Sequence, residues 1–368
     1  MREQSNPMRV LIVTRNFKLA SGLNNIVLDY LRSFPKGRIA VAHASFVTPE
    51  PSFKQELESR GISTFQLDDR QLLSSVSILH SLLKDRRFDL IVGTSWKSYV
   101  VAALARIGTR TKSVAWIHGI PLEMKGPVRK YAYRILFWHR PIIFLSQAVR
   151  NAHSYGFHAG KEYVVYPGIA PLPSLYTRRM RATIGVPNDA FVVGYTAEFI
   201  EWKNHIAVLQ AASALIDRYP SLHIVLIGDG TIRDQVAQTS AALGLDGRVH
   251  FLGKRNDAKA LLGTFDVYVH PSDGEAFGLA LAEAMLAGLP VLASNTGAFP
   301  EIIENEITGL LVPPHDAEKI SEGLARLIDD PVLRRELGRR ARQAIERRFT
   351  VDKFTTALTE AFEGANSP

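Results

Sequence analysis

Residues 270–285 read HPSDGEAFGLALAEAM, and their first residue, His270, is the last residue of the run Asp266–His270. The apolar run predicts a buried strand, the Pro/Ser/Asp/Gly stretch predicts a loop, and the residues from about Phe277 onward predict an apolar helix. Free backbone N–H groups at such a helix start, together with the helix dipole, form an anion site suited to a diphosphate. This segment therefore predicts one strand–loop–helix unit of a doubly wound α/β domain.

The same alternation of short apolar runs and helical patterns extends over the whole chain, which predicts parallel sheets covered on both faces. The expected strands are Val10–Val13, Ile39–Val47, Leu90–Gly93, Ser113–Ile117 and Ile142–Leu145 in the first half, and Phe191–Thr196, His223–Gly228, Val249–Leu252, Asp266–His270 and Pro290–Ser294 in the second. Three prolines in Pro167–Pro173 interrupt the pattern. We place the domain boundary there, between residues 1–172 and 173–348.

The composition is that of a globular protein, with 46% hydrophobic and 22% charged residues among 368. The absence of cysteine excludes disulfides and thiolate metal sites. No stretch approaches the ~18 consecutive apolar residues of a membrane helix. The run Val10–Val13 is too short for a signal peptide, so we expect a cytoplasmic location.

Positive charge is concentrated in the first half of the chain. Residues 1–174 hold 24 Lys and Arg and 11 Asp and Glu, whereas the rest holds 20 and 25, for a total of +8. This asymmetry favours an anionic partner, with a solvated basic surface as the alternative. Within Lys125–Arg140, cations and aromatics alternate at helical spacing, which suits either a peripheral contact with an anionic membrane or a helix packed on its own sheet. No nucleic-acid recognition module accompanies the charge.

Glu283 stands among Ala and Leu residues in the predicted helix. A carboxylate there is costly to bury unless donors hydrogen-bond to it. A ribose diol would supply two such donors, whereas a loop N–H group or an arginine would give the residue a structural role. The residue types leave both interpretations open.

The spacing of Glu275 and Glu283 within GEAFGL…EAM, followed by AGLPVLAS at 287–294 and by Pro300–Ile302, resembles the signature of the family 4 glycosyltransferases. The resemblance is strong over about 191–314 and loose before Ile117. It implies a GT-B fold, in which two Rossmann-like domains face a central cleft. It also implies that the amphipathic segment at 349–368 is a helix that crosses back to the N-terminal domain.

The resemblance assigns roles to residues that match the family pattern. It implies that His118, Lys203 and Glu275 are catalytic, with Glu275 against the donor sugar, and that Glu283 holds the ribose hydroxyls. The remaining expected donor-binding residues are Gly22, Gly228, Asp229, Lys254, Arg255, Ala276, Phe277, Gly278 and Leu279. No cluster of His, Asp and Glu has the spacing of a metal site, so we expect neither metal nor another cofactor.

One position departs from the family pattern, in which an Arg stands five residues before the Lys and both clamp the diphosphate. Here Lys203 matches the Lys, but Glu198 stands in the place of the Arg. A carboxylate near a diphosphate costs electrostatic energy unless a cation neutralises it. Either another cation such as Arg255, Lys254 or Arg15 compensates, or Glu198 turns away or pairs with Lys203, or the protein binds its donor poorly.

The function implied is a retaining glycosyltransferase that moves a hexose-type sugar from a UDP- or GDP-sugar to a glycan or lipid-linked acceptor. Synthesis of lipopolysaccharide or another envelope or exocellular polysaccharide, with peripheral attachment to the inner face of the plasma membrane, would suit the basic first half. A sugar-nucleotide epimerase or hydrolase is the alternative among enzymes. A catalytically silent sensor or scaffold is the alternative from another class, and Glu198 is its support.

Overall fold

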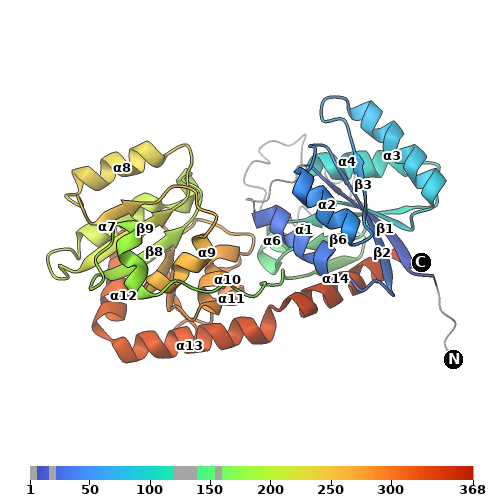
Figure 1. Ribbon diagram of the computed structural model, residues 1–368. Coiled ribbons are helices and arrows are strands. Elements are labelled where there is room, and N and C mark those ends of the chain that lie inside the picture. The colour runs from blue at the N-terminus through green and yellow to red at the C-terminus, as the bar shows by residue number, and fades with distance from the viewer. Residues whose placement is uncertain (1–5, 16–21, 120–138, 154–159, 368) are drawn as a thin grey trace. The chain divides into compact units, whose positions relative to one another are not determined.

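The computed structural model describes residues 6–15, 22–119, 139–153 and 160–367 (Figure 1). The chain divides into two compact units. The first unit comprises Met1–Gly168 and Val351–Pro368, and the second comprises Ile169–Thr350. The basic segment Lys125–Arg140, apart from its last two residues, lies outside the described residues, as does Ser21 beside the predicted Gly22 loop.

The first unit is built on a seven-stranded parallel sheet in the order β3-β2-β1-β4-β5-β6-β7. Its strands are β1 (Met8–Thr14), β2 (Ile39–Ser45), β3 (Ser63–Gln66), β4 (Leu90–Gly93), β5 (Lys112–Ile117), β6 (Ile142–Phe144) and β7 (Glu162–Val164). The described helices of this unit are α1 (Gly22–Ser33), α2 (Pro51–Ser59), α3 (Leu72–Arg86), α4 (Trp96–Ala105), α6 (Gln147–Ala152) and α14 (Val351–Asn366).

The second unit is built on a six-stranded parallel sheet in the order β10-β9-β8-β11-β12-β13. Its strands are β8 (Phe191–Thr196), β9 (Leu222–Ile227), β10 (Val249–Phe251), β11 (Val267–His270), β12 (Val291–Ser294) and β13 (Leu310–Val312). Its helices are α7 (His205–Ser213), α8 (Arg233–Ala242), α9 (Ala258–Leu261), α10 (Leu279–Leu286), α11 (Phe299–Ile302), α12 (Ala317–Asp329) and α13 (Pro331–Arg348), with 3₁₀ turns η1 (Arg178–Ile184), η2 (Glu201–Lys203) and η3 (Leu262–Thr264).

Both sheets reverse their strand order once, between β1 and β4 in the first unit and between β8 and β11 in the second. This is the topology of a doubly wound sheet, in which ligands bind beyond the carboxyl ends of the strands at the point of reversal. The predicted pair of Rossmann-like α/β domains is therefore confirmed, and the reversal in the second unit falls between the two strands that precede the Glu198 and Glu275 loops.

All ten strands expected from the sequence are present, and three further strands were missed. The missed strands are β3, β7 and β13. Each is only three or four residues long and lies at the edge of its sheet, so it needs an apolar pattern on one side only. The residues of β3 show this directly, because all four are partly or fully exposed.

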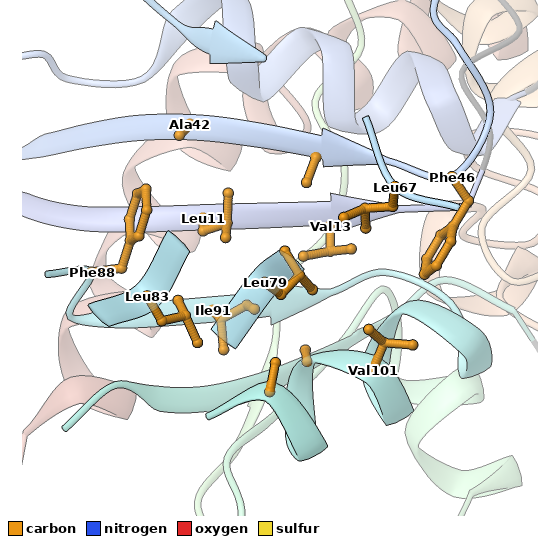
Figure 2. Close-up of a cluster of buried hydrophobic side chains, with 13 residues drawn as sticks. Leu11, Val13, Ala42, Phe46, Leu67, Leu79, Leu83, Phe88, Ile91 and Val101 are labelled. Carbon is orange, nitrogen blue, oxygen red and sulfur yellow. The ribbon is translucent and has the colours of Figure 1, made fainter. Parts of the chain in front are cut away.

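A continuous apolar cluster fills the first unit between its sheet and helices α3 and α4. Leu11 and Val13 of β1 meet Ile91 of β4 and Leu79 of α3 within this cluster, and all four are fully buried (Figure 2). The burial of such side chains is the main source of stability in a domain of this kind.

The C-terminal helix α14 belongs to the first unit, as expected from the resemblance. Tyr30 Oη lies 3.2 Å from Thr359 Oγ1, and the Tyr30 ring packs edge-on against Phe362 at 5.6 Å. The carboxylate of Glu363 accepts a hydrogen bond of 2.6 Å from Arg38. The helical segment is interrupted between Arg348 and Val351, so α13 and α14 are separate helices.

A buried arginine fastens η1 to the sheet of the second unit. The Arg181 side chain is 1% exposed and pairs with Asp266 at 2.7 Å. It also donates to Thr264 O at 2.7 Å, and Asp266 in turn accepts from Val192 N at 2.8 Å. Arg178 pairs with the same carboxylate, but its side chain is 65% exposed.

We predict that Arg181→Met destabilises the second unit by about 3–5 kcal/mol, because Asp266 then loses its buried partner. The matched change Arg178→Met removes an exposed partner of the same carboxylate and is expected to cost about 1 kcal/mol or less. Urea unfolding followed by Trp202 fluorescence, with the other tryptophans replaced by phenylalanine, measures both. Equal costs for the two variants would contradict this account.

Candidate functional site

The predicted donor residues of the second unit lie on loops that follow β8, β9, β10 and β11. Gly228 and Asp229 come after β9, Lys254 and Arg255 after β10, and Glu275 after β11. Since all these strands are parallel, their carboxyl ends meet at one edge of the sheet. The fold therefore gathers residues that are up to 77 positions apart in the sequence, from Glu198 to Glu275.

The loops at this edge approach one another so closely that two positions require glycine. Gly228 has φ 143°, and a Cβ there would overlap Ala197 O. A Cβ at Gly230 would overlap Phe199 O. Asp229 is exposed, and its carboxylate accepts a hydrogen bond of 2.9 Å from Gly230 N. The turn after β9 is thus pressed against the loop after β8.

At the reversal point, the structure brings Lys203 and Glu275 together. The Lys203 ammonium pairs with Glu275 Oε1 and lies 4.0 Å from the centre of the Trp202 ring. His270 Nε2 lies 3.0 Å from the same Oε1 atom. Each of the side chains of Lys203 and Glu275 is 12% exposed, and that of His270 is 2% exposed.

The electrostatics of this cluster keep Glu275 ionised. Burial raises the pKa of its carboxyl, but the His270 hydrogen bond and the Lys203 charge outweigh this and lower the pKa to about 2. Burial in turn lowers the pKa of His270, with Glu275 opposing the shift. At neutral pH Glu275 is therefore a carboxylate, and burial favours the neutral form of His270.

Two hydrogen bonds to backbone oxygens join the loops that carry Lys203 and Glu275. Asp273 N donates to Trp202 O at 2.8 Å, and Asn204 Nδ2 donates to Pro271 O at 2.8 Å. Asn204 itself has φ 55°, a left-handed conformation that Asn adopts more readily than most residues. Gly297, with φ 56°, lies where a Cβ would overlap the Glu275 backbone.

The helix expected near Phe277 begins two residues later, at Leu279, with Gly278 as its N-cap. Gly278 has φ 91°, and a Cβ there would meet the Phe299 ring. No side chain caps this helix. In the described structure the N–H groups of Ala276, Gly278 and Leu279 have no hydrogen-bond acceptor. Unpaired N–H groups at the start of a helix are the kind of group that binds anions, so the predicted diphosphate site stays a prediction here.

Glu283 is held by a lysine that the sequence patterns did not indicate. Lys259 of α9 pairs with Glu283 Oε1 at 2.7 Å, and the Glu283 side chain is 17% exposed. Burial raises the pKa of Glu283, with Lys259 opposing the rise. Both interpretations of Glu283 therefore stay open. The pair between Lys259 and Oε1 supports a structural role, and Oε2 is left to accept a hydrogen bond from another donor such as a ribose hydroxyl.

Two of the cations expected to compensate for Glu198, Arg255 and Lys254, form no hydrogen bond or ion pair with the Lys203 cluster in the described structure. Arg255 is exposed and donates two hydrogen bonds of 2.7 Å to Asp257, and Lys254 is exposed. Glu198 is also exposed, and in the described residues its carboxylate forms no ion pair. It does not pair with Lys203, which is taken by Glu275.

Two predicted site residues belong to the first unit. Gly22 is the first residue of α1. His118 follows β5, is 6% exposed, and packs against Trp116 with ring centres 4.3 Å apart. Neither of its ring nitrogens has a hydrogen-bond partner in the described residues, and burial lowers its pKa to about 3. His118 is therefore a neutral imidazole whose two nitrogens are buried and have no partner in the described residues.

Sequence analysis missed His270 and Lys259 as parts of the site. The place of His270 at the end of the strand that leads into the Glu275 loop was a signal for a position near the site, but it did not show that the two side chains meet. Nothing in the pattern around Lys259 indicated its pairing with Glu283. In the described part of the chain, no three His, Asp or Glu side chains are grouped as metal ligands, and no helix is long and apolar enough to span a bilayer.

Comparison with known proteins places this site within a known domain. Residues 177–344 match the family model "Glycosyl transferases group 1". The match covers less than half of the chain, and we call the matched residues the group 1 domain. The site clusters of Lys203, Glu275 and Glu283 all lie within it, whereas His118 and Gly22 lie outside.

Curated relatives of the group 1 domain are glycosyltransferases of different names. A D-inositol 3-phosphate glycosyltransferase of Saccharomonospora viridis is 34% identical over 196 residues, which cover 50% of this chain and 45% of the relative. A lipopolysaccharide core biosynthesis glycosyltransferase, LpsE of Rhizobium meliloti, is 29% identical over 49% of this chain and 52% of its own length. The chain thus aligns with about half the length of these relatives.

Solved structures share the fold over almost the whole chain. Alr3699/HepE of Anabaena in complex with UDP and glucose superposes with a TM-score of 0.81 over 97% of this chain and 99% of its own, at 24% identity. The outer core galactosyltransferase WaaB in its apo form gives 0.75 over 97% and 99%, at 18% identity. The likeness extends through both units and the group 1 domain.

We predict that the Glu275 carboxylate makes stability depend on pH. Its pKa in the folded protein is about 2, below its ordinary value of 4.5, so its contribution is present above pH 4.5 and is lost as pH falls toward 2. Glu275→Gln should therefore cost most stability, on the order of 3 kcal/mol, near pH 7 and progressively less below pH 4.5.

Urea unfolding at several pH values measures this difference. The exposed Glu322 of α12, which pairs with Lys319 at the surface, provides the matched control Glu322→Gln, with little effect at any pH. A cost for Glu275→Gln that stays constant from pH 7 to pH 3 would contradict the assignment.

Proposed function

We propose that the chain is a retaining, metal-independent glycosyltransferase that moves a hexose-type sugar from a UDP- or GDP-sugar to a glycan or lipid-linked acceptor. The observation that carries the proposal is the pair of buried glutamates of the group 1 domain. Glu275 and Glu283 each have Oε1 held by a cation. In the described structure their Oε2 atoms have no partner and are not fully buried.

Two free carboxylate oxygens beside unpaired N–H groups suit a molecule that carries hydroxyls at both ends and phosphates between them. Glu283 would accept the ribose hydroxyls, and the N–H groups of Ala276, Gly278 and Leu279 would hold the diphosphate. Glu275 would then face the sugar. A nucleotide sugar has this arrangement, and one protein of similar fold, Alr3699/HepE of Anabaena, has been solved with UDP and with UDP-glucose.

The chemistry follows from where charge develops. Cleavage of the bond between the anomeric carbon and the phosphate oxygen leaves negative charge on the diphosphate and positive charge on the sugar ring. The Lys203 ammonium and the α10 N–H groups would stabilise the first charge, because they are in place before the reaction. The acceptor oxygen would attack the anomeric carbon from the face that the diphosphate leaves, and a phosphate oxygen would take its proton.

His118 is proposed to orient the sugar rather than to act as a base. Its pKa of about 3 keeps the imidazole neutral, so it can donate or accept one hydrogen bond. As a general base it would be weak, since the best catalytic bases have a pKa near the working pH.

The acceptor is proposed to be a glycan or lipid carrier of the cell envelope, with lipopolysaccharide as one candidate. Two features support this part of the proposal. The curated relatives include lipopolysaccharide core enzymes. The first half of the chain also carries the excess positive charge that would attract an anionic acceptor or membrane surface on the cytoplasmic side.

We predict that one nucleoside diphosphate raises the melting temperature without metal, that Mg²⁺ adds nothing, and that Glu283→Ala abolishes the rise. A panel of UDP, GDP, ADP and their sugars in a thermal-shift assay makes the measurement. At 100 times the dissociation constant, binding stabilises by about 2.7 kcal/mol, which corresponds to several degrees.

The exposed Glu322→Ala variant is the matched control and should respond like the wild type. No stabilisation by any nucleotide would contradict the proposal and favour the silent scaffold that Glu198 suggests. Binding followed by donor turnover in the absence of any acceptor would favour an epimerase or a hydrolase.

A further inference from the structure

His270 is the last residue of β11, and its ring is held on three sides. The ring centres of Tyr195 and Phe299 lie 5.2 Å and 5.0 Å away, both steeply inclined, and that of Tyr268 lies at 6.0 Å. All three of these rings are fully buried. Because the packing fixes the ring, His270 has little freedom to change rotamer.

The hydrogen bonds of His270 define its tautomer. Its Nε2 lies 3.0 Å from Glu275 Oε1, and its Nδ1 is buried without a partner in the described structure. An ionised carboxylate only accepts hydrogen bonds. His270 therefore donates its Nε2–H to Glu275, and Nδ1 carries the lone pair.

The two donors on Glu275 both reach the same oxygen. Lys203 and His270 converge on Oε1 from η2 and from β11, whereas Oε2 has no partner among the described residues. Oε2 is also absent from the fully buried polar atoms, so it accounts for part of the 12% exposure of this side chain. The carboxylate is thereby held through Oε1 by two donors, and Oε2 is left without a partner and partly exposed.

We propose that His270 is a positioning residue that orients the Glu275 carboxylate so that Oε2 accepts a hydroxyl of the sugar being transferred. A flexible lysine alone leaves the carboxylate free to rotate about its last bond, whereas a second donor on a rigid ring fixes the plane. This inference rests on the proposed function and adds a residue that acts on sugar recognition rather than on nucleotide binding.

Two substitutions separate the hydrogen bond from the packing. His270→Leu keeps the apolar volume but removes the donor, whereas His270→Gln places an amide nitrogen near the position of Nε2. His223 provides the matched control. It is 6% exposed, belongs to β9 of the same sheet, and bonds through Nδ1 to His250 at 2.9 Å. His223→Leu removes a buried, hydrogen-bonded imidazole from the amino end of a strand.

The first measurement needs no donor. In wild type, ¹⁵N spectra of labelled histidine should show His270 as the Nε2–H tautomer, and the ¹³C signal of the Glu275 carboxyl should titrate far below pH 4.5. In His270→Leu this titration should move to higher pH, and in His270→Gln it should move less. A Glu275 titration that is the same in all three proteins, or an Nδ1–H tautomer, would overturn the proposal.

The second measurement compares UDP with UDP-glucose by calorimetry. In His270→Leu we expect UDP affinity within about 2-fold of wild type, and a loss of roughly 10-fold in the gain that glucose adds, as for a hydrogen bond to a charged group. His270→Gln should recover most of that gain, and His223→Leu should retain all of it. Equal losses for UDP and UDP-glucose, or no recovery in His270→Gln, would show a structural role and overturn the proposal.

Failure of the proposed function and failure of the His270 inference give different results. If the wild type binds neither UDP nor UDP-glucose, the proposed UDP donor is wrong, and the carboxyl titration decides by itself whether His270 orients Glu275.

Discussion

The buried ion pair between Lys203 and Glu275 joins the loops that follow the two strands at the reversal point of the second sheet. Neither charge can be left alone at that depth, since an unpaired buried charge costs several kcal/mol. The loops must therefore stay together, and their backbone contacts and the bare Gly297 backbone allow the approach. The helix start at Gly278 and its free N–H groups are placed by the same constraint.

This pairing bears on position 198, where this chain has a glutamate and the family that it resembles has an arginine. Lys203 is shared between Glu275 and, in our proposal, the diphosphate, so its charge is partly used before a donor arrives. Glu198 is exposed to solvent, and water weakens the repulsion between exposed charges. The N–H groups of the α10 helix then carry more of the anion binding than they would beside two free cations.

The sequence predicted those parts of the molecule that depend on local patterns. Apolar runs predicted ten of the thirteen described strands, and the resemblance marked Gly228 and Gly278, where the structure brings other groups too close for a Cβ. What it could not show is which side chains meet across the sheet edge. Tertiary packing decides that His270 meets Glu275 and that Lys259 meets Glu283. It also decides that Glu198 is exposed. The edge strands β3, β7 and β13 were missed because each is only three or four residues long.

The central claim is that the N–H groups at the start of α10 bind the diphosphate of a nucleotide sugar. Amide hydrogen exchange tests this claim most directly. In the free protein the N–H groups of Ala276, Gly278 and Leu279 have no acceptor, so they should exchange rapidly. On addition of UDP-glucose without metal, our account predicts that exchange at these amides slows at least tenfold, with smaller changes elsewhere in the domain. Unchanged exchange at residues 276–279, despite saturating binding detected by another method, would contradict it.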